Sequence, residues 1–121
     1  MPTMGPLGQV SRKVKDIATA RQWYGETLGL QHLYSFGDLA FFDLDGTRLF
    51  LSQDQNTDGD SILYFRVPDI HAAHTELASR GVEFIQPPHV IHRHEDGTEE
   101  WMAFFKDNDA RPLGIMSQAK L

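Results

Sequence analysis

Apolar residues recur at helical spacing in two stretches of the chain, and each stretch begins after an aspartate and stops at a glycine. The first runs from Asp16 to Gly29 and the second from Asp69 to Gly81. An aspartate caps a helix by accepting a bond from a free N–H group of the first turn, and a glycine readily ends one. The pattern therefore predicts two amphipathic helices. Their inward faces are Ile17, Ala20, Tyr24 and Leu28, and Ile70, Ala73 and Leu77.

Short runs typical of strands surround each helix. One run precedes each helix, at 9–14 and at 62–67. Three runs follow the first helix, at 32–36, 39–43 and 48–52, and the second helix is followed by 82–85, by 90–94 with 99–106, and by 112–117. Asp45-Gly46 and Asp96-Gly97 are typical of two-residue hairpin turns. The polar stretch 53–60 is expected to be a linker.

The second half of the chain repeats the first. Val14-Lys-Asp-Ile17 matches Val67-Pro-Asp-Ile70, and Ala40-Phe-Phe42 matches Ala103-Phe-Phe105. The offset grows between the two matches, so the second copy contains an insertion between Gly81 and Ala103. We therefore predict an α+β fold of two tandem βαβββ modules, at about 8–52 and 61–117, within one domain spanning 1–121.

Composition narrows the function classes. The chain has 121 residues and no cysteine, which excludes disulfides and thiolate chemistry and suits a reducing compartment. It has neither a signal-peptide pattern at its start nor an apolar run of membrane-spanning length. Its formal charge of −6 argues against a nucleic-acid partner and mildly favours neutral or cationic ligands. We expect a cytoplasmic protein that does not enter a membrane.

Alternation along the strands predicts which side chains face away from the helices. These residues mix aromatic, apolar and polar types: Gln9, Ser11, Lys13, Arg48, Phe50, Ile62, Tyr64, Arg66, Gly114 and Met116. Such a mixture fits a curved sheet around a ligand cavity, although a sheet–sheet or dimer contact would also fit. Arg12 breaks the alternation, which suggests a position near a sheet edge or an interface. Lys13 and Arg66 occupy equivalent repeat positions and either hold an anionic group or extend to the rim.

Several motifs together resemble one superfamily. They are V-x-D-I at Val14, Y-x-x-x-L-G-L at Tyr24, R-G-V-E-F at Arg80 and A-F-F-K-D-x-D at Ala103. The chain resembles the vicinal oxygen chelate superfamily, which includes glyoxalase I, bleomycin-resistance proteins, extradiol dioxygenases and methylmalonyl-CoA epimerase. The resemblance implies a curved mixed sheet around a cleft, often completed across a homodimer.

The resemblance also locates where metal enzymes of this superfamily hold their ion. The four equivalent positions are Gln9, Phe50, Ile62 and Gly114, and only Gln9 offers an oxygen. A divalent ion needs several N, O or S donors, so we expect no metal there. We expect an apolar floor instead, with Gly114 leaving room above Phe50. The common D-P-D-G turn is replaced by Asp107-Asn-Asp-Ala110.

A histidine-rich hairpin offers other chemistry. With a two-residue turn at Asp96-Gly97, His94 would oppose Glu99 and His92 would oppose Trp101 on the same face. We expect Trp101 to be one of the ligand-binding residues. Arg93 would oppose Glu100 on the other side. His92, His94 and Glu99 could then hold a divalent metal, or His92 and His94, with Tyr64, could act as acid–base catalysts. The alternative is a solvated or cleft-rim hairpin. His71 and His74, on the second helix, are expected to be solvated.

These observations favour a homodimeric protein without a cofactor that binds or sequesters a small organic ligand. The alternative is a lyase or isomerase, glyoxalase- or epimerase-like, that acts on a small oxygenated metabolite. A third reading is a non-catalytic interaction module. Whether the protein is an enzyme is left open by the sequence.

Overall fold

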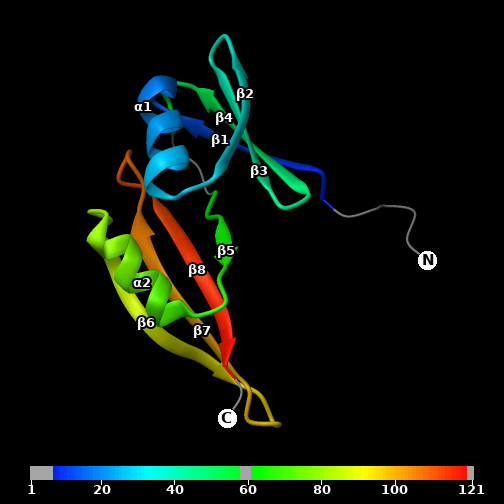
Figure 1. The fold of residues 1–121 in the computed structure, drawn as a ribbon, viewed down its shortest axis with the longest axis vertical. Coiled ribbons are helices and arrows are strands. Elements are labelled where there is room, and N and C mark those ends of the chain that lie inside the picture. The colour runs from blue at the N-terminus through cyan, green and yellow to red at the C-terminus, as the bar shows by residue number, and fades with distance from the viewer. Residues whose placement is uncertain (1–6, 58–60, 120–121) are drawn as a thin grey trace, which may run out of the picture. The chain divides into compact units, whose positions relative to one another are not determined.

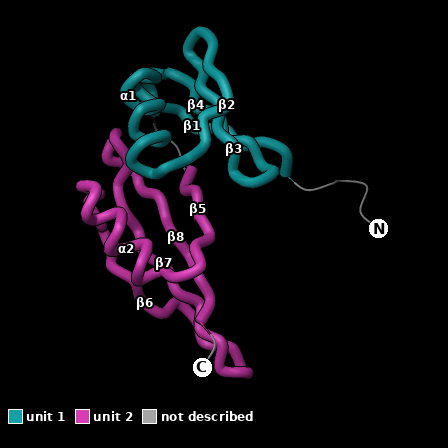
Figure 2. The backbone as a smooth tube through the Cα atoms, viewed as in Figure 1, with its two compact units in different colours: residues 1–59 teal, residues 60–121 magenta. Residues whose placement is uncertain are grey.

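The computed structural model describes residues 7–57 and 61–119, and the chain divides into two compact units, 1–59 and 60–121 (Figure 2). Each unit consists of a four-stranded mixed sheet with one helical segment (Figure 1). This confirms the predicted pair of βαβββ modules. Of the predicted linker, residues 58–60 lie outside the described residues.

The first unit contains β1 (Gln9–Val14), α1 (Ile17–Gln22), the π-helix η1 (Trp23–Thr27), β2 (Gln31–Phe36), β3 (Leu39–Leu44) and β4 (Thr47–Gln53). Its strand order is β1-β4-β3-β2, with β1 parallel to β4 and the other pairs antiparallel. Asp45 and Gly46 both have positive φ, at 57° and 107°. This is the backbone of a tight hairpin turn, as their sequence predicts.

The second unit contains β5 (Tyr64–Arg66), α2 (Ile70–Ser79), β6 (Phe84–Arg93), β7 (Glu99–Lys106) and β8 (Pro112–Ala119). Its order, β5-β8-β7-β6, is the same arrangement as in the first unit. The runs predicted at 82–85 and 90–94 are wrong as separate strands, because register shifts keep one strand, β6, paired with β7. The insertion therefore lengthens β6, β7 and the hairpin between them.

Both helices begin and end as their sequence predicts. Asp16 accepts a bond from the Ala18 N–H at 3.1 Å, and Asp69 caps α2 in the same way. Gly81, at φ 88°, closes α2, because the Val82 N–H reaches the Leu77 carbonyl at 3.1 Å. The first helix widens into η1 before it ends at Gly29, where φ is 78° and the Leu30 N–H reaches the Tyr24 carbonyl at 3.1 Å. No helix among the described residues is long and apolar enough to span a membrane.

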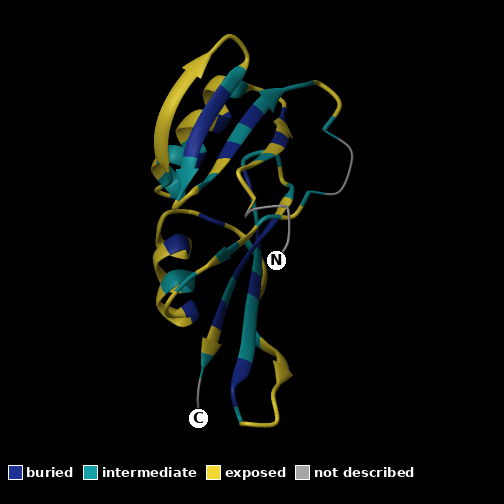
Figure 3. Cartoon of the chain, turned by 90° about the vertical axis from the view of Figure 1, so that its right-hand side faces the viewer, coloured by how far each residue is buried: buried dark blue, intermediate teal, exposed yellow. Residues whose placement is uncertain are grey.

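The helix-facing side of each sheet forms the core of its unit, and buried residues alternate with exposed ones along the strands (Figure 3). The repeat is visible in equivalent fully buried residues: Phe42 and Phe105, and Leu49 and Leu113. Arg12 also lies on this side of β1, an edge strand, with only 1% of its surface exposed. It is therefore a core-side residue of its unit, opposite Leu51 in the sheet register.

Candidate site on the helix-free faces of the sheets

Four aromatic rings form a continuous layer on the helix-free face of the first unit, which we call the aromatic shelf: Tyr34, Phe36, Phe41 and Phe50. Sheet register explains it, because Tyr34 pairs with Phe41 and Phe41 pairs with Phe50. Ring centroids lie 4.6–6.1 Å apart with interplanar angles of 6–25°. Tyr34 and Phe36 remain 43% and 58% exposed. Phe41 is only 7% exposed, so Tyr34 and Phe36 are the two rings of the shelf on which a further planar group could stack.

Arg48 lies at the edge of this shelf and is held in place from three directions. Its Nε donates to the Gln9 side-chain oxygen at 2.9 Å, and its Nη1 donates to the Tyr34 hydroxyl at 3.2 Å. Its guanidinium carbon lies 5.5 Å from the centre of the Phe41 ring, a cation–π distance. Because none of these contacts is with a carboxylate, a full positive charge is oriented beside the rings.

The other predicted ligand residues of this face lie next to the shelf. Ser11 pairs in register with Phe50 and is exposed. Lys13 is also exposed and forms an ion pair with Asp54 at 3.7 Å. Lys13 and Arg66 belong to different units, so the idea that they hold one anionic group from two sides stays a prediction.

The helix-free face of the second unit is centred on Gly114, and here one expectation is wrong. A Cβ added at Gly114 would lie 3.0 Å from the Tyr64 ring and 3.2 Å from the Phe104 ring. These two rings meet edge to face with centroids 5.9 Å apart. The predicted room at Gly114 is therefore filled by aromatic carbon, because both neighbouring strands direct a ring toward the glycine.

One of the residues predicted for this face lies on the other side of the sheet. Arg66 pairs in register with Met116, and Ile62 is 41% exposed. Trp101, however, is on the helix side, since its ring lies 4.9 Å from that of His71 on α2. Trp101 is thus not a ligand residue of the helix-free face, and His71 is not simply solvated. His74 likewise contacts the Phe84 ring at 4.4 Å.

The histidine hairpin has a different register from the predicted one. His92 pairs with Glu100 and Arg93 with Glu99, because the turn spans several residues and is closed by a His94 N–H bond to the Thr98 carbonyl. Glu99 forms an ion pair with Arg93 and accepts a bond from the Trp101 ring at 3.2 Å. Glu99 is therefore on the helix side, away from the two histidines.

Glu100 takes the place expected for Glu99. Its Oε2 is bonded to the His94 Nε2 at 2.8 Å and accepts from the Gln118 amide at 2.6 Å. The His92 ring lies 4.7 Å from that of His94. Within the described ranges, no three His, Cys, Asp or Glu side chains are arranged to hold a metal ion.

Hydrogen bonds to the ionised form lower the pKa of Glu100 below its usual 4.5, with His94 the largest cause, followed by Gln118. The pKa of Glu99 is lowered mainly by its hydrogen bond from Arg93. Both carboxylates thus stay charged in the folded hairpin at pH values where they would be protonated in the unfolded chain.

This difference makes part of the stability pH-dependent. A carboxyl group with a lowered folded pKa stabilises fully above its unfolded pKa, and the contribution is lost as pH falls through the folded value. We therefore expect Glu100→Gln to reduce the loss of unfolding free energy between pH 7 and pH 3. Urea unfolding at pH 7 and at pH 3 measures the free energy of unfolding, and the difference between the two values is compared between the variant and the wild type. Glu95→Gln, in the same hairpin, is the control, and equal pH differences in the wild type and Glu100→Gln would contradict the expectation.

The four positions at which superfamily metal enzymes place ligands do not fit a metal here. Gln9 is bonded to Arg48, and Phe50 is part of the aromatic shelf. Ile62 has only an apolar side chain, and the space at Gly114 is filled by rings. A single neutral amide oxygen is a poor substitute for a set of donors.

Sequence reasoning missed five residues of these two faces: Tyr34, Phe36, Phe41, Phe104 and Glu100. A signal for two of them was present, because Phe41 and Phe104 are equivalent within the repeated Ala-Phe-Phe. With Phe42 and Phe105 assigned to the core, period-2 alternation places the preceding phenylalanine on the opposite face. Glu100 depended on the hairpin register, which the sequence does not fix.

Comparison with known proteins gives a family and a fold. Residues 7–110 match the model of the Glyoxalase/Bleomycin resistance protein/Dioxygenase superfamily. A protein from the mobile metagenome of V. pseudocholerae has 19% identity and a TM-score of 0.77 over 97% of each chain. A Sphaerobacter thermophilus member of the same superfamily has 19% identity and a TM-score of 0.74, covering 96% of this chain and 99% of its own. No curated protein matches significantly.

Proposed function

Because the chain belongs to the glyoxalase/bleomycin resistance protein/dioxygenase superfamily, we propose that it binds a small planar organic molecule on the aromatic shelf. The observation that carries the proposal is the shelf itself, four nearly parallel rings of which two are about half exposed. A planar ligand would extend this stack and bury apolar surface on both sides of the contact. Sequestration of such a molecule needs no metal and no acid–base group.

Arg48 supports a preference among planar ligands. Gln9, Tyr34 and Phe41 hold the guanidinium in place, so little side-chain freedom remains to be lost on binding. A carbonyl, carboxylate or sulfonate oxygen at the ligand edge would accept a charge-assisted bond from it. A planar molecule bearing such an oxygen therefore fits the shelf better than an aliphatic one.

The fluorescent probe 1-anilinonaphthalene-8-sulfonate tests this proposal, because it combines planar rings with an anionic oxygen group. We expect saturable binding that weakens about ten-fold in Phe36→Ala and in Arg48→Gln, each removing one contact worth about 1.4 kcal/mol. Ile91→Ala is the matched control, since Ile91 is 48% exposed but lies in the second unit. Equal affinity for all four proteins would reject the shelf as the site.

A second function is favoured by one specific observation, the bond between His94 and the ionised Glu100. A carboxylate that accepts from one ring nitrogen fixes the orientation and tautomer of the imidazole, so that its other nitrogen is free to accept a proton from a substrate. A lyase or isomerase would use this pair, with His92 beside it, to move a proton on a small oxygenated metabolite. Deuterium exchange into dihydroxyacetone in D2O tests it. Exchange lost in His94→Gln but kept in His89→Gln would favour the enzyme.

Three properties expected from the sequence remain predictions. Assembly as a homodimer, a cytoplasmic location and the absence of a cofactor rest on the sequence and the family. Light scattering on the purified full chain measures the first of these directly.

A further inference from the structure

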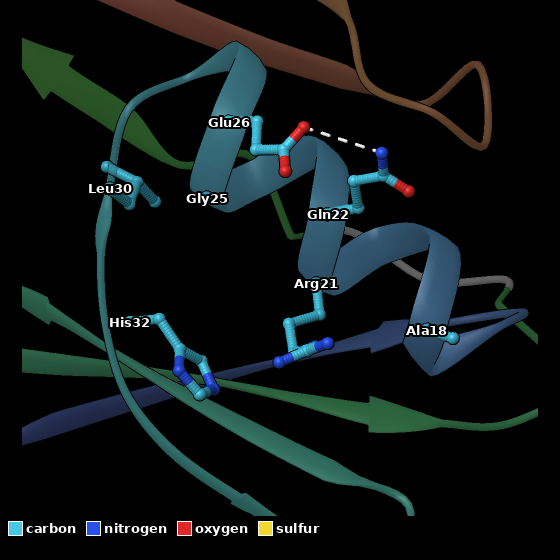
Figure 4. Close-up of a pocket in the computed structure, with 7 residues that line it drawn as sticks. All are labelled: Ala18, Arg21, Gln22, Gly25, Glu26, Leu30 and His32. Carbon is cyan, nitrogen blue, oxygen red and sulfur yellow. Dashed lines mark hydrogen bonds between the residues drawn. The ribbon is translucent and has the colours of Figure 1, made fainter.

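A groove outside both helix-free faces lies between the helical segment of the first unit and the start of β2 (Figure 4). Its volume is about 480 Å³, enough for a small metabolite. The groove is lined on the helix side by Arg21, Gln22, Gly25 and Glu26, and on the other side by Leu30 and His32. No residue of the aromatic shelf takes part in it.

The local backbone explains why a groove exists here. The helix widens into η1, where the Leu28 N–H bonds to the Trp23 carbonyl five residues earlier at 3.1 Å. Widened π turns inside helices are frequent at functional sites. Gly25 lies within this turn and contributes no side chain to the groove wall. The Phe42 ring is near residues of both walls, because its centroid lies 5.5 Å from that of His32 and its edge would lie 3.7 Å from a Cβ added at Gly25.

The basic side chains of the groove face its open space, whereas the acidic one is turned aside. Arg21 and His32 extend into the same space, whereas Glu26 turns toward the Gln22 amide, 3.4 Å away (Figure 4). The described part of the chain contains no hydrogen-bond or ion-pair partner for Arg21. His32 is oriented by Ser35, whose hydroxyl lies 2.6 Å from its Nε2, so its other ring nitrogen can face a ligand. The groove thus presents a guanidinium and an oriented imidazole together, within a chain of net charge −6.

We propose that this groove is a second ligand site, which binds the carboxylate or phosphate group of a small metabolite between Arg21 and His32. A guanidinium donates two parallel bonds to either group, and the imidazole adds a third contact from the opposite wall. Leu30 and the glycine-lined wall leave room for a small apolar body. The site does not depend on the function proposed for the shelf, because the two share no side chain.

A simpler role for Arg21 predicts a different result. Arg21 lies within the continuous helical segment 17–27, where arginine favours the helix without any ligand. Such a role would make Arg21 matter for stability but not for anion binding. The two roles are separated by measuring binding in a folded variant.

The test is a titration of the ¹⁵N-labelled full chain with inorganic phosphate and, separately, with acetate, at an ionic strength held constant with sodium chloride. We expect saturable amide shifts confined to residues 21–26 and 30–32 with at least one of the two anions. Saturation by only one anion identifies the chemical class. Arg21→Gln should weaken that binding at least ten-fold, and its otherwise unchanged spectrum would show that it folds.

Two matched controls sharpen the result. Arg80→Gln removes an exposed arginine at the end of α2, and Lys15→Gln removes an exposed cation just before α1. Both should bind the anion as the wild type does. Failure of both anions to saturate, or equal affinity of Arg21→Gln and wild type, would overturn the proposal. Neither of those outcomes bears on the proposed ligand binding at the aromatic shelf, because that proposal is tested with a different probe.

Discussion

Phe42→Ala is expected to lower the free energy of unfolding by about 3–5 kcal/mol, the usual loss for a fully buried phenylalanine. Phe42 has no exposed surface and lies between the helical segment and the sheet of the first unit. Its ring is 6.3 Å from that of Tyr24 and 5.5 Å from that of His32. Truncation would leave a cavity next to Gly25, which has no side chain that could move into it.

The repeat makes the same experiment available in the second unit. Phe105 is the equivalent residue, also without exposed surface, and its ring lies 5.4 Å from that of Phe84. Phe105→Ala should therefore cost a similar amount, again about 3–5 kcal/mol. Urea unfolding at pH 7 measures both variants. Phe36→Ala, which removes a ring that is 58% exposed, is the control and should cost far less. A loss below about 1 kcal/mol for both buried phenylalanines would contradict the assignment of the core.

The fold could be predicted because its signals are local and occur twice. Asp16 and Asp69 cap helices through their own side chains, and Gly81 ends one through its positive φ. Each of these interactions forms between residues that are close in the sequence, so it can be predicted from the local residue pattern. The duplication then predicts that the two units have the same fold, and they do share one strand order.

The hairpin of the second unit shows where such reasoning stops. Asp96-Gly97 looks like a two-residue turn, but the Asp96 carboxylate accepts from the Thr98 N–H at 2.9 Å and the turn spans more residues. A one-residue change in register moves each side chain to the opposite face of the sheet. For this reason Glu100, and not Glu99, meets His94.

The sequence predicted on which side of a sheet the site residues lie, but not which residues they contact. Alternation correctly placed Arg48, Phe50 and Tyr64 on the helix-free sides. It could not show that Gln9 and Tyr34 hold Arg48, because those bonds connect strands far apart in the sequence. The same limit explains the error at Gly114, where the missing side chain suggested space that rings on β5 and β7 fill.

That filled space leads to a second large effect. Gly114→Glu, which introduces a side chain with oxygen donors at this position, is expected to cost about 3 kcal/mol or more. Already the Cβ would lie 3.0 Å from Tyr64 and 3.2 Å from Phe104, so both rings must move. The carboxylate would then be next to aromatic carbon, where its loss of hydration is not compensated.

A double substitution separates crowding from the general cost of a charge in the strand. Phe104→Ala removes one of the two rings, so Gly114→Glu should cost less in that background, with a coupling of about 1 kcal/mol or more. Met116→Glu is the matched control, because Met116 lies two residues further along β8, on the same face, and pairs in register with Arg66. Its carboxylate can reach water and a cation, so its cost should be small. Urea unfolding of the four variants measures these differences. A Gly114→Glu protein as stable as Met116→Glu would mean that the rings leave room for a side chain, and the position would again be open to a metal ligand.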